Sequence, residues 1–490
     1  IRVLRQDGGS LAYQPVSFRE LGQQRDCLAA GLSQLGIAKG RRVGILTDGG
    51  EEPLLVFLAT DCLGVSSVPL CLKVPPEILL HSINHSGMEL LFVDTRGLAQ
   101  YERVRGLLQK PPRLVLIRGE SLSAAAVDQA VSWDQLLDLG RGRPVPRVDV
   151  QPDDETKILY TSGSSGLPKG VVQTNANIVA NVAQAWDIIS RRDELRFFKS
   201  APDYHSLGIL NIYVPLAKGW TLDLARSPER VLADIRVSEP EAFLTVPLIL
   251  DKVYGNVRRE MEKGGLTSSL VRAAVRAKQR LAAGTAGVAD RAFHAALGSR
   301  VIAKIKAQLA TRVGANLELL VVGSAKADPE ALDFFHQVLD ITTFEGYGTT
   351  ECAPLIAVNN LTGRKVGTVG RPLLKARIMS PGDHELGYFD PATGQLRPSG
   401  EQAGELWVSG PNVMAGYLGD PEETAKTLVE GPDGGVWYRT GDLFSLDEEG
   451  FLRFHGRVGR QFKLANGEFV NPELLEGTFA HVNLVEHVLV

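Results

Sequence analysis

The side chains best suited to bind a polyphosphate gather in one loop, residues 160 to 170, with the sequence YTSGSSGLPKG. Hydroxyl groups can hydrogen-bond phosphate oxygens, glycines let the backbone approach closely, and a lysine supplies positive charge. The spacing is not that of a Walker-type loop, so a flexible Gly/Ser turn is the alternative. The groups concerned are the hydroxyls of Thr161, Ser162, Ser164 and Ser165, the glycines Gly163, Gly166 and Gly170, and the cation Lys169.

A second polar segment begins at Glu345 with the sequence EGYGTTE, directly after an apolar run. In it Thr350 can hydrogen-bond a phosphate oxygen, Tyr347 can stack on a base, and Glu351 is a hard oxygen ligand suited to Mg²⁺. Taken one by one, these residues have structural alternatives, because an acidic residue after a strand is often a cap and a tyrosine often packs in a core. The segment alone therefore leaves a nucleotide site and a structural turn equally open.

Three further segments carry chemically useful groups. Asp442 follows a glycine turn in WYRTGDL, where its carboxylate could accept both hydroxyls of a ribose or close an Asx-turn instead. His205 lies in PDYHSLG among aromatic and apolar residues, where a lone histidine is more often structural than catalytic. Arg457 leads towards another Gly-bearing turn that starts at Lys463 and places cations near the carboxyl end.

The elements that would position these groups form an α/β pattern. Residues 158–160 predict a buried strand entering the phosphate loop, and residues 177–189 predict a helix leaving it. Strand and helix patterns alternate on both sides of this point, which favours largely parallel, helix-covered sheets. A Pro-rich charged segment, residues 141–154, is interpreted as the connection between two such subdomains. From 366 to 454, short strands separated by Gly/Pro turns predict a small β-barrel subdomain.

Length, charge and cysteine content narrow the functional classes. The chain has 490 residues, 44% of them hydrophobic, which is enough for at least two packed subdomains. Because 53 Lys/Arg are balanced by 57 Asp/Glu, no overall positive field favours nucleic acid as a partner. Four scattered cysteines fit reduced thiols, and no apolar run is long enough to span a membrane. We therefore expect a cytoplasmic protein, with peripheral membrane contact left open.

One region departs from this even charge balance. Between residues 251 and 312 there are 13 Lys/Arg and 4 Asp/Glu, and Arg272, Arg276 and Arg280 recur at helical spacing. Such a stripe is most often a solvated surface. The alternative is a docking face for an acidic partner or for the phosphates of a carrier.

Taken together and in this order, five motifs resemble those of the adenylate-forming superfamily of acyl-CoA synthetases, luciferases and peptide-synthetase adenylation domains. They are YTSGSSGLPKG, EGYGTTE, the run GELWVSGPNVMAGYL from Gly404, YRTGD, and GR at Gly456. The resemblance covers essentially the whole chain and implies an ATP-dependent acid:thiol ligase. Such an enzyme forms an acyl-AMP with release of pyrophosphate, then passes the acyl group to CoA or to a carrier-protein phosphopantetheine. KLANGEFV resembles the turn of long-chain acyl-CoA synthetases and carboxylic-acid reductases, which favours a fatty or similarly apolar carboxylate.

The resemblance also implies a role for each candidate residue. Lys169, Thr350, Glu351, His205 and Lys463 would be catalytic: His205 would gate the carboxylate and Lys463 would serve thioester formation. Glu351 would hold Mg²⁺ and, with Thr350, meet the α-phosphate. Tyr347 would flank the adenine, Gly323, Ser324 and Ala325 would line the adenine and acyl pocket, and Asp442 and Arg457 would hold the ribose. The β- and γ-phosphates would be bound by Thr161, Ser162, Gly163, Ser164, Ser165, Gly166 and Lys169, and the remaining nucleotide-binding residues would be Glu345, Gly346, Gly348 and Thr349.

The implied domain order is an adenylation core over residues 1–456, a hinge at 457–460, and the beginning of a small α+β lid at 461–490, truncated or disordered. Within the core, α/β subdomains are expected at about 1–150 and 151–360, and the β-barrel subdomain at about 361–456. Gly459 stands where the family usually has aspartate or lysine, so we expect a freer hinge. The adenylation lysine near the end of the family's lid is expected to be absent from these residues.

Two rival functions remain open at this point. The chain could be the adenylation or loading domain of a carboxylic-acid reductase or a polyketide-type megasynthase. It could also be a non-catalytic nucleotide-binding protein that keeps the pocket without the lid lysine. Pyrophosphate release by the full-length protein would separate the enzymes from the binding protein.

Overall fold

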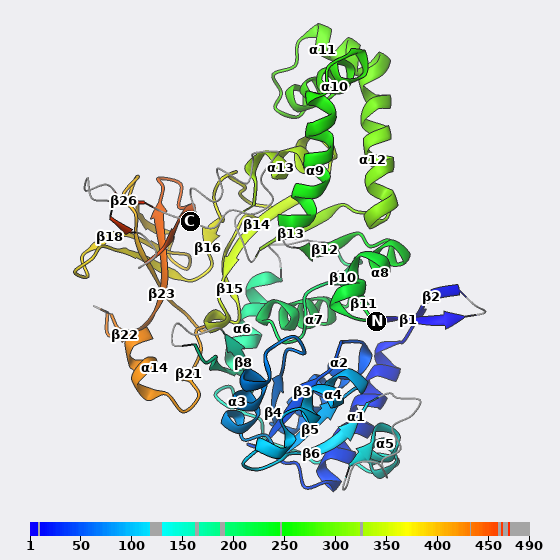
Figure 1. The fold of residues 1–490 in the computed structure, drawn as a ribbon. Helices are drawn as coiled ribbons and strands as arrows, with labels where there is room; N and C mark the ends of the chain where they lie inside the picture. The colour runs from blue at the N-terminus through cyan, green and yellow to red at the C-terminus, as the bar shows by residue number, and fades with distance from the viewer. Residues whose placement is uncertain are drawn as a thin grey trace.

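Two helix-covered sheets and one smaller antiparallel sheet make up the molecule (Figure 1). The computed structural model describes residues 1–7, 10–117, 130–161, 166–186, 192–245, 247–323, 327–431, 433–458, 462–463 and 469–470. None of the helices in these ranges is both long and apolar enough to cross a membrane.

The first sheet has eight strands in the order β21-β9-β8-β4-β3-β5-β6-β7. Its central strands are parallel, whereas β9 runs antiparallel to both β8 and β21. The strands are β3 (Arg42–Leu46), β4 (Ser66–Pro69), β5 (Leu90–Val93), β6 (Arg113–Leu116), β7 (Val131–Ser132), β8 (Glu155–Thr161), β9 (Lys169–Thr174) and β21 (Gly416–Tyr417). Its helices are α1 (Phe18–Gln34), α2 (Glu51–Leu63), α3 (Pro76–Ser86), α4 (Thr95–Glu102) and α5 (Trp133–Gly140).

The second sheet has nine strands in the order β16-β15-β14-β13-β12-β10-β11-β1-β2. The strands are β1 (Arg2–Asp7), β2 (Ser10–Pro15), β10 (Arg196–Lys199), β11 (Thr221–Leu224), β12 (Ala242–Thr245), β13 (Leu319–Val322), β14 (Thr342–Gly348), β15 (Leu355–Val358) and β16 (Arg371–Pro372). Its helices are α6 (Asn175–Ala185), α7 (Ser206–Lys218), α8 (Val231–Ser238), α9 (Pro247–Glu262), α10 (Leu266–Ala282), α11 (Val288–Phe293), α12 (Ser299–Val313) and α13 (Pro329–Asp333).

The boundary expected near residue 150 does not match the sheets. Strands β8 and β9, over residues 155–174, belong to the first sheet, because β8 pairs with β4. The amino-terminal β1–β2 hairpin belongs instead to the second sheet, through β11. The Pro-rich segment over residues 141–154 marks a connection at the surface. It does not determine which sheet the following strand, β8, joins.

The third sheet has seven strands, all paired antiparallel, which agrees with the pattern of short strands and turns. One segment leaves this subdomain: β21 pairs with β9 of the first sheet, and α14 (Pro421–Thr427) follows it. The strands are β17 (Lys375–Met379), β18 (Glu385–Asp390), β19 (Gln395–Arg397), β20 (Gly404–Ser409), β22 (Leu428–Glu430), β23 (Val436–Leu446) and β24 (Leu452–Arg457), and a separate pair is formed by β25 (Phe462–Lys463) and β26 (Phe469–Val470).

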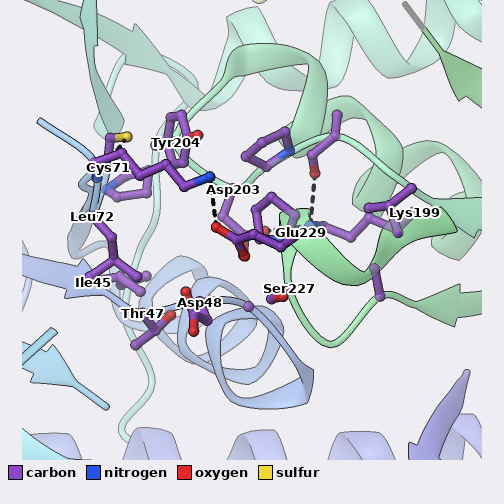
Figure 2. A pocket seen from close by; sticks show the side chains of 18 of the residues that line it. Ile45, Thr47, Asp48, Cys71, Leu72, Lys199, Asp203, Tyr204, Ser227 and Glu229 are labelled. Atoms are coloured by element: carbon purple, nitrogen blue, oxygen red, sulfur yellow. Dashed lines mark hydrogen bonds and ion pairs between the residues drawn. The ribbon is translucent and has the colours of Figure 1, made fainter. Parts of the chain in front are cut away.

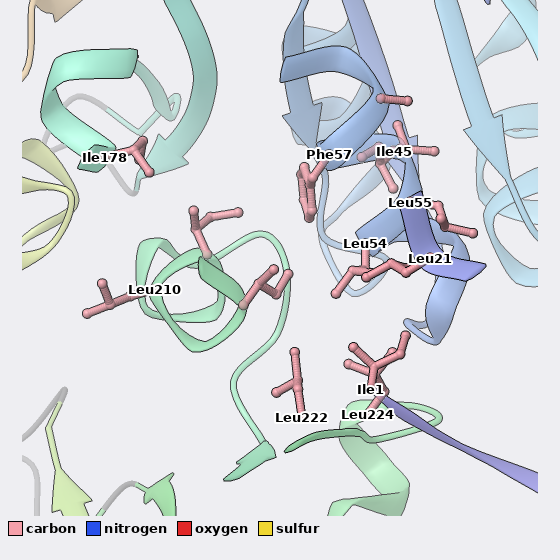
Figure 3. Packing of buried hydrophobic residues seen from close by; sticks show 14 of the residues in the cluster. Ile1, Leu21, Ile45, Leu54, Leu55, Phe57, Ile178, Leu210, Leu222 and Leu224 are labelled. Atoms are coloured by element: carbon pink, nitrogen blue, oxygen red, sulfur yellow. The ribbon is translucent and has the colours of Figure 1, made fainter. Parts of the chain in front are cut away.

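One apolar core joins the two large sheets. It combines Ile45 and Phe57 from the first sheet and its helix α2 with Leu210 of α7 and Leu222 of β11 (Figure 3). Removing this apolar surface from water fixes the sheets against each other, so that their carboxyl ends border a common space. A buried Lys157 adds a polar link, because its ammonium pairs with Asp61.

Candidate active site

The phosphate loop connects two antiparallel strands of the first sheet. Strand β8 ends at Thr161, β9 begins at Lys169, and these two residues face each other in the register. Ser162, Gly163, Ser164 and Ser165 lie outside the described residues, as do Ser324, Ala325 and Gly459. Of Lys463 the structure describes only the backbone in β25. The structure therefore describes this loop at its two ends, at Thr161 and from Gly166 to Lys169.

Lys169, at the end of the loop, is held by two residues from the segment around β21. Its ammonium forms an ion pair with Glu423 of α14 and lies 5.2 Å from the centre of the Tyr417 ring. The hydrogen bond from Lys169 is the main reason that the pKa of Glu423 is lowered. The position of this cation is therefore set from outside the loop.

Glu351 shares the same tyrosine. The Tyr417 hydroxyl donates to Glu351 Oε1 at 2.9 Å, and burial followed by this carboxylate raises the tyrosine's pKa. The backbone at this point is also fixed, because Met414 N donates to the Glu351 carbonyl at 2.7 Å and the Gln173 side-chain amide donates to the Thr350 carbonyl at 2.7 Å. Tyr417 thus brings the loop cation and the predicted Mg²⁺ ligand to one side chain.

A second tyrosine contacts the predicted ribose ligand. The Tyr347 hydroxyl donates to Asp442 Oδ2 at 2.6 Å, and Arg457 Nε lies 3.2 Å from Asp442 Oδ1. Asp442 and Arg457 are cross-strand partners in the β23–β24 hairpin. Burial, followed by Asp442, raises the pKa of Tyr347 well above its usual value, and its ring packs on Phe444 with centroids 4.7 Å apart. In the structure Tyr347 is therefore anchored to the third sheet at both its ring and its hydroxyl.

The turn that precedes Asp442 is supported by Glu405 of β20. Its carboxylate accepts hydrogen bonds from the backbone of Gly441 at 3.2 Å and from the Trp407 indole at 2.9 Å, and it pairs with Arg439 at 2.9 Å. Because three donors converge on one carboxylate, the position of the turn is set by the sheet behind it.

The EGYGTTE segment positions the nucleotide candidates through backbone packing. At Gly348 a Cβ would lie 2.1 Å from the Pro354 carbonyl oxygen, so only glycine fits. Glu345 points the other way: it is buried, and its Oε1 accepts from the backbone of Ala327 at 3.2 Å. Glu345 therefore supports the backbone at Ala327, whereas Thr350 and Glu351 continue towards Tyr417.

His205 stands directly before α7. The residue as a whole is exposed, although partial burial lowers the pKa of its imidazole, and its ring lies 4.7 Å, between centroids, from the ring of Tyr204. The segment before His205 packs closely against the first turn of α7. Only glycine fits at Gly208, because a Cβ there would lie 1.9 Å from the Pro202 carbonyl oxygen. The histidine is thus presented at a fixed helix start rather than packed into the core.

A pocket lies beside Tyr204, beyond the carboxyl ends of strands from both large sheets (Figure 2). It has an internal volume of about 30 Å³. Ion pairs surround it: Lys73 with Glu229 at 2.7 Å, and Arg96 with Asp48 at 2.8 Å. The hydrogen bond from Lys73 is the main cause that lowers the pKa of Glu229 to about 2. Strand-end residues that line it are Ile45, Pro69, Lys199 and Ala225.

Sequence reasoning missed several residues that organise this site. Asn181 and Asn412 both donate to the carbonyls of Cys352 and Leu355, on either side of the turn after Glu351. Tyr417 and Asn412 lie in the GELWVSGPNVMAGYL run that carried part of the family resemblance, and this run was the available signal. Glu423 lies beyond the run and had no such signal.

A family model described as AMP-binding enzyme matches residues 6–418. The peroxisomal long chain acyl-CoA synthetase 6 of Arabidopsis thaliana is 30% identical, over 98% of this chain and 67% of its own length. The long-chain-fatty-acid–CoA ligase 1 of Homo sapiens is 26% identical, over 98% of this chain and 68% of its own length.

Two solved structures share the fold. The adenylation domain of a carboxylate reductase from Mycobacterium chelonae has a TM-score of 0.74 at 23% identity and covers 99% of this chain and 73% of its own. A long-chain-fatty-acid-CoA ligase from Archaeoglobus fulgidus has a TM-score of 0.69 at 20% identity, over 99% of this chain and 84% of its own. These matches confirm the predicted fold class, and the family model together with the 30% identical relative shows that the chain belongs to the AMP-binding enzyme family.

Proposed function

We propose that the protein is an ATP-dependent acid:thiol ligase that activates a fatty or similarly apolar carboxylate. The observation that carries this proposal is the contact of Tyr417 with both Lys169 and Glu351. The tyrosine holds a loop cation and a carboxylate close together. This arrangement suits a polyphosphate, which needs positive charge at one end and a metal ion at the other. Asp442 supplies a carboxylate of the kind that holds ribose hydroxyls.

The chemistry follows from where charge develops. A carboxylate oxygen of the substrate attacks the α-phosphorus of ATP, the bond to the β-phosphate oxygen breaks, and pyrophosphate leaves with that electron pair. A thiol then loses its proton and attacks the acyl carbon, and AMP leaves with the electrons of the acyl–oxygen bond. Because no covalent enzyme intermediate forms, the residues contribute by orienting the reactants and neutralising charge. Lys169 steadies the leaving pyrophosphate, and His205 borders the carboxylate.

The donor set at Glu351 fits Mg²⁺. No group of three or more His, Cys, Asp or Glu suited to a metal occurs in the described part of the chain. A single carboxylate is what Mg²⁺ requires when phosphates and water supply its other ligands. When bound, the ion would neutralise negative charge on the phosphates, and Tyr417 would hold the Glu351 carboxylate in place.

We propose the pocket beside Tyr204 as the approach of the acceptor thiol. It borders the residue next to His205. Lys73 and Arg96 at its margin, which pair with Glu229 and Asp48 in the structure, would exchange these carboxylates for the phosphates of CoA or of a carrier phosphopantetheine. Lys73→Ala with Arg96→Ala should raise KM for CoA roughly tenfold while pyrophosphate exchange stays unchanged. An unchanged KM for CoA would remove this assignment.

Pyrophosphate exchange across a panel of carboxylates of increasing chain length tests the whole proposal. We expect exchange that rises with chain length and is lost in Lys169→Ala. The relatives named as long-chain acyl-CoA synthetases and ligases support the expectation that the longer, more apolar carboxylates of the panel are the better substrates. Absence of exchange with every carboxylate, measured on the full-length protein, would favour a nucleotide-binding protein without catalysis.

A second candidate function is the adenylation domain of a carboxylate reductase. The structural match to such a domain, with a TM-score of 0.74, supports this second candidate function. Offering the activated acyl group to CoA and, separately, to a phosphopantetheinylated carrier protein distinguishes the two acceptors. We further propose a cytoplasmic location, which imaging of the tagged full-length protein in an organelle would contradict.

A further inference from the structure

Helices α9 to α12 form an arm between two neighbouring strands of the second sheet (Figure 1). The connection runs over residues 246–318, between β12 and β13, which pair directly and in parallel. A parallel crossover needs only a dozen or more residues, usually one helix. The arm therefore contains much more structure than the sheet requires, and its outer surface invites a separate explanation.

Two long helices of this arm carry only positive charge. Helices α10 and α12 contain four Lys/Arg each and no Asp or Glu. The whole chain has a formal net charge of −4, so the positive charge of these helices is opposite in sign to the net charge of the molecule. Their apolar faces are used inward, because Val275 and Ile302 are buried in a core cluster with Phe334.

The stripe predicted on α10 is not one open face. Arg272 donates to the Met261 carbonyl, Arg280 pairs with Asp290 at 2.9 Å, and Lys278 pairs with Asp340 at 2.7 Å. The unpaired charge is divided between Arg276 of this stripe and α12. On α10 and α12, which the structure describes in full, four exposed cations form no ion pair: Arg276, Arg300, Lys304 and Arg312.

Large apolar side chains are also exposed on this arm. Leu266, the first residue of α10, is 92% exposed, and Val288, the first residue of α11, is 86% exposed. Leu297, in the π-helical segment His294–Gly298 between α11 and α12, is 40% exposed. A dock for an acidic protein would need the cations alone. Cations together with protruding apolar residues are typical of helices that lie on anionic lipid.

We propose that this arm binds a membrane surface rich in anionic lipid, with Arg300 and Lys304 of α12 at the headgroups and Leu266 and Val288 at the acyl boundary. The proposal goes beyond the ligase reaction, although an apolar carboxylate delivered from a bilayer would suit that reaction. Vesicle binding requires no turnover, so its outcome is independent of the proposed function.

The test is sedimentation of the full chain with vesicles of phosphatidylcholine, with and without phosphatidylglycerol. We expect binding only to the anionic vesicles and its weakening at high salt. Arg300→Glu with Lys304→Glu should lower the partition coefficient at least about tenfold, since each cation near such a surface contributes measurably. The matched control, Lys110→Glu with Arg113→Glu, changes the net charge equally beside β6, far from the arm in Figure 1.

Leu266→Gln supplies a second variant that keeps the charge. It should weaken the part of vesicle binding that persists at high salt, because that part depends on apolar contact. No wild-type binding to anionic vesicles at low salt would overturn the proposal. Equal losses in the α12 pair and in the control pair would overturn it too. Transfer to an acidic carrier protein that depends on Arg300 while vesicles are ignored would assign the arm to a protein partner instead.

Discussion

Two parts of the site, which we call the Lys169 corner and the Arg457 corner, contain the same three kinds of group but assemble them differently. In each, a tyrosine hydroxyl donates to a carboxylate near a cation: Tyr417 to Glu351 beside Lys169, and Tyr347 to Asp442 beside Arg457. The Lys169 corner joins β9, β21 and the segment after β14, which come from three parts of the chain. In the Arg457 corner, acid and cation are already partners in one hairpin.

The difference teaches which corner depends on tertiary structure. A cross-strand pair in a hairpin forms wherever the hairpin forms, so the Asp442–Arg457 pair is a local product. The Lys169 corner exists only when segments about 250 residues apart meet, as the Lys169–Glu423 pair shows with a separation of 254. We therefore expect substitutions at the Lys169 corner to cost more activity than equivalent ones at the Arg457 corner.

The largest contrast should come from removing the two cations. Lys169→Ala should lower kcat/KM for adenylation roughly 100- to 1000-fold, because it removes charge aimed at the leaving pyrophosphate. Arg457→Ala should cost about tenfold or less, since its side chain is 59% exposed and water replaces it. Pyrophosphate-exchange kinetics measure both. Similar losses in the two variants would break the comparison.

Removing the two hydroxyls should give the next largest difference. Tyr417→Phe should lower kcat roughly tenfold, because Glu351 loses a donor that holds its position. Tyr347→Phe leaves Asp442 with Arg457 and should mainly raise KM for ATP by a few fold. The separation of kcat from KM is the readout. Tyr347→Phe acting on kcat as strongly as Tyr417→Phe would reverse the ranking of the corners.

A smaller effect is expected at Glu423, the partner that only the Lys169 corner has. Glu423→Gln frees the ammonium of Lys169 from a competing carboxylate and should lower KM for ATP about two- to fivefold, since a partly exposed ion pair is worth under ~1 kcal/mol. The neighbouring Glu422→Gln removes an exposed carboxylate of the same helix and should change nothing. An ATP KM that rises in Glu423→Gln would show that the pair supports binding.

The smallest effect concerns pH. The pKa of Glu423 is depressed below its ordinary 4.5, so the pair stabilises the fold fully above that value. This contribution is lost as pH falls through the depressed pKa. Wild type and Glu423→Gln should therefore differ slightly in thermal unfolding near pH 7 and converge in acid. A difference that persists at low pH would mean that the pair is not its source.

The sequence predicted those parts of the site that local pattern determines. Strand β8 entering the loop was expected and forms, because an apolar run acts over a few residues. The role of Tyr417 could not be predicted. It depends on the pairing of Tyr417 with Val171, which no local pattern specifies.

The same reason explains the two differences in organisation. The division near residue 150 follows a change in composition, whereas strand pairing follows available edges across the fold. The basic stripe on α10 was predicted from helical spacing alone. In the folded chain Arg280 of this stripe pairs with Asp290, and the neighbouring Lys278 pairs with Asp340. Both acids lie on other elements, so helical spacing could not predict these pairs.

Strand β21 also has a consequence for the edges of the first sheet. An open edge presents unpaired backbone groups to other chains and invites aggregation. In this sheet both outermost strands have two residues, β21 on one side and β7 on the other. Beneath β21, the phosphate-loop strand has its carbonyls at Gly170 and Val172 occupied by Leu418 and Ala415. The segment that orients Tyr417 therefore also keeps a valine-containing strand from serving as a template for self-association.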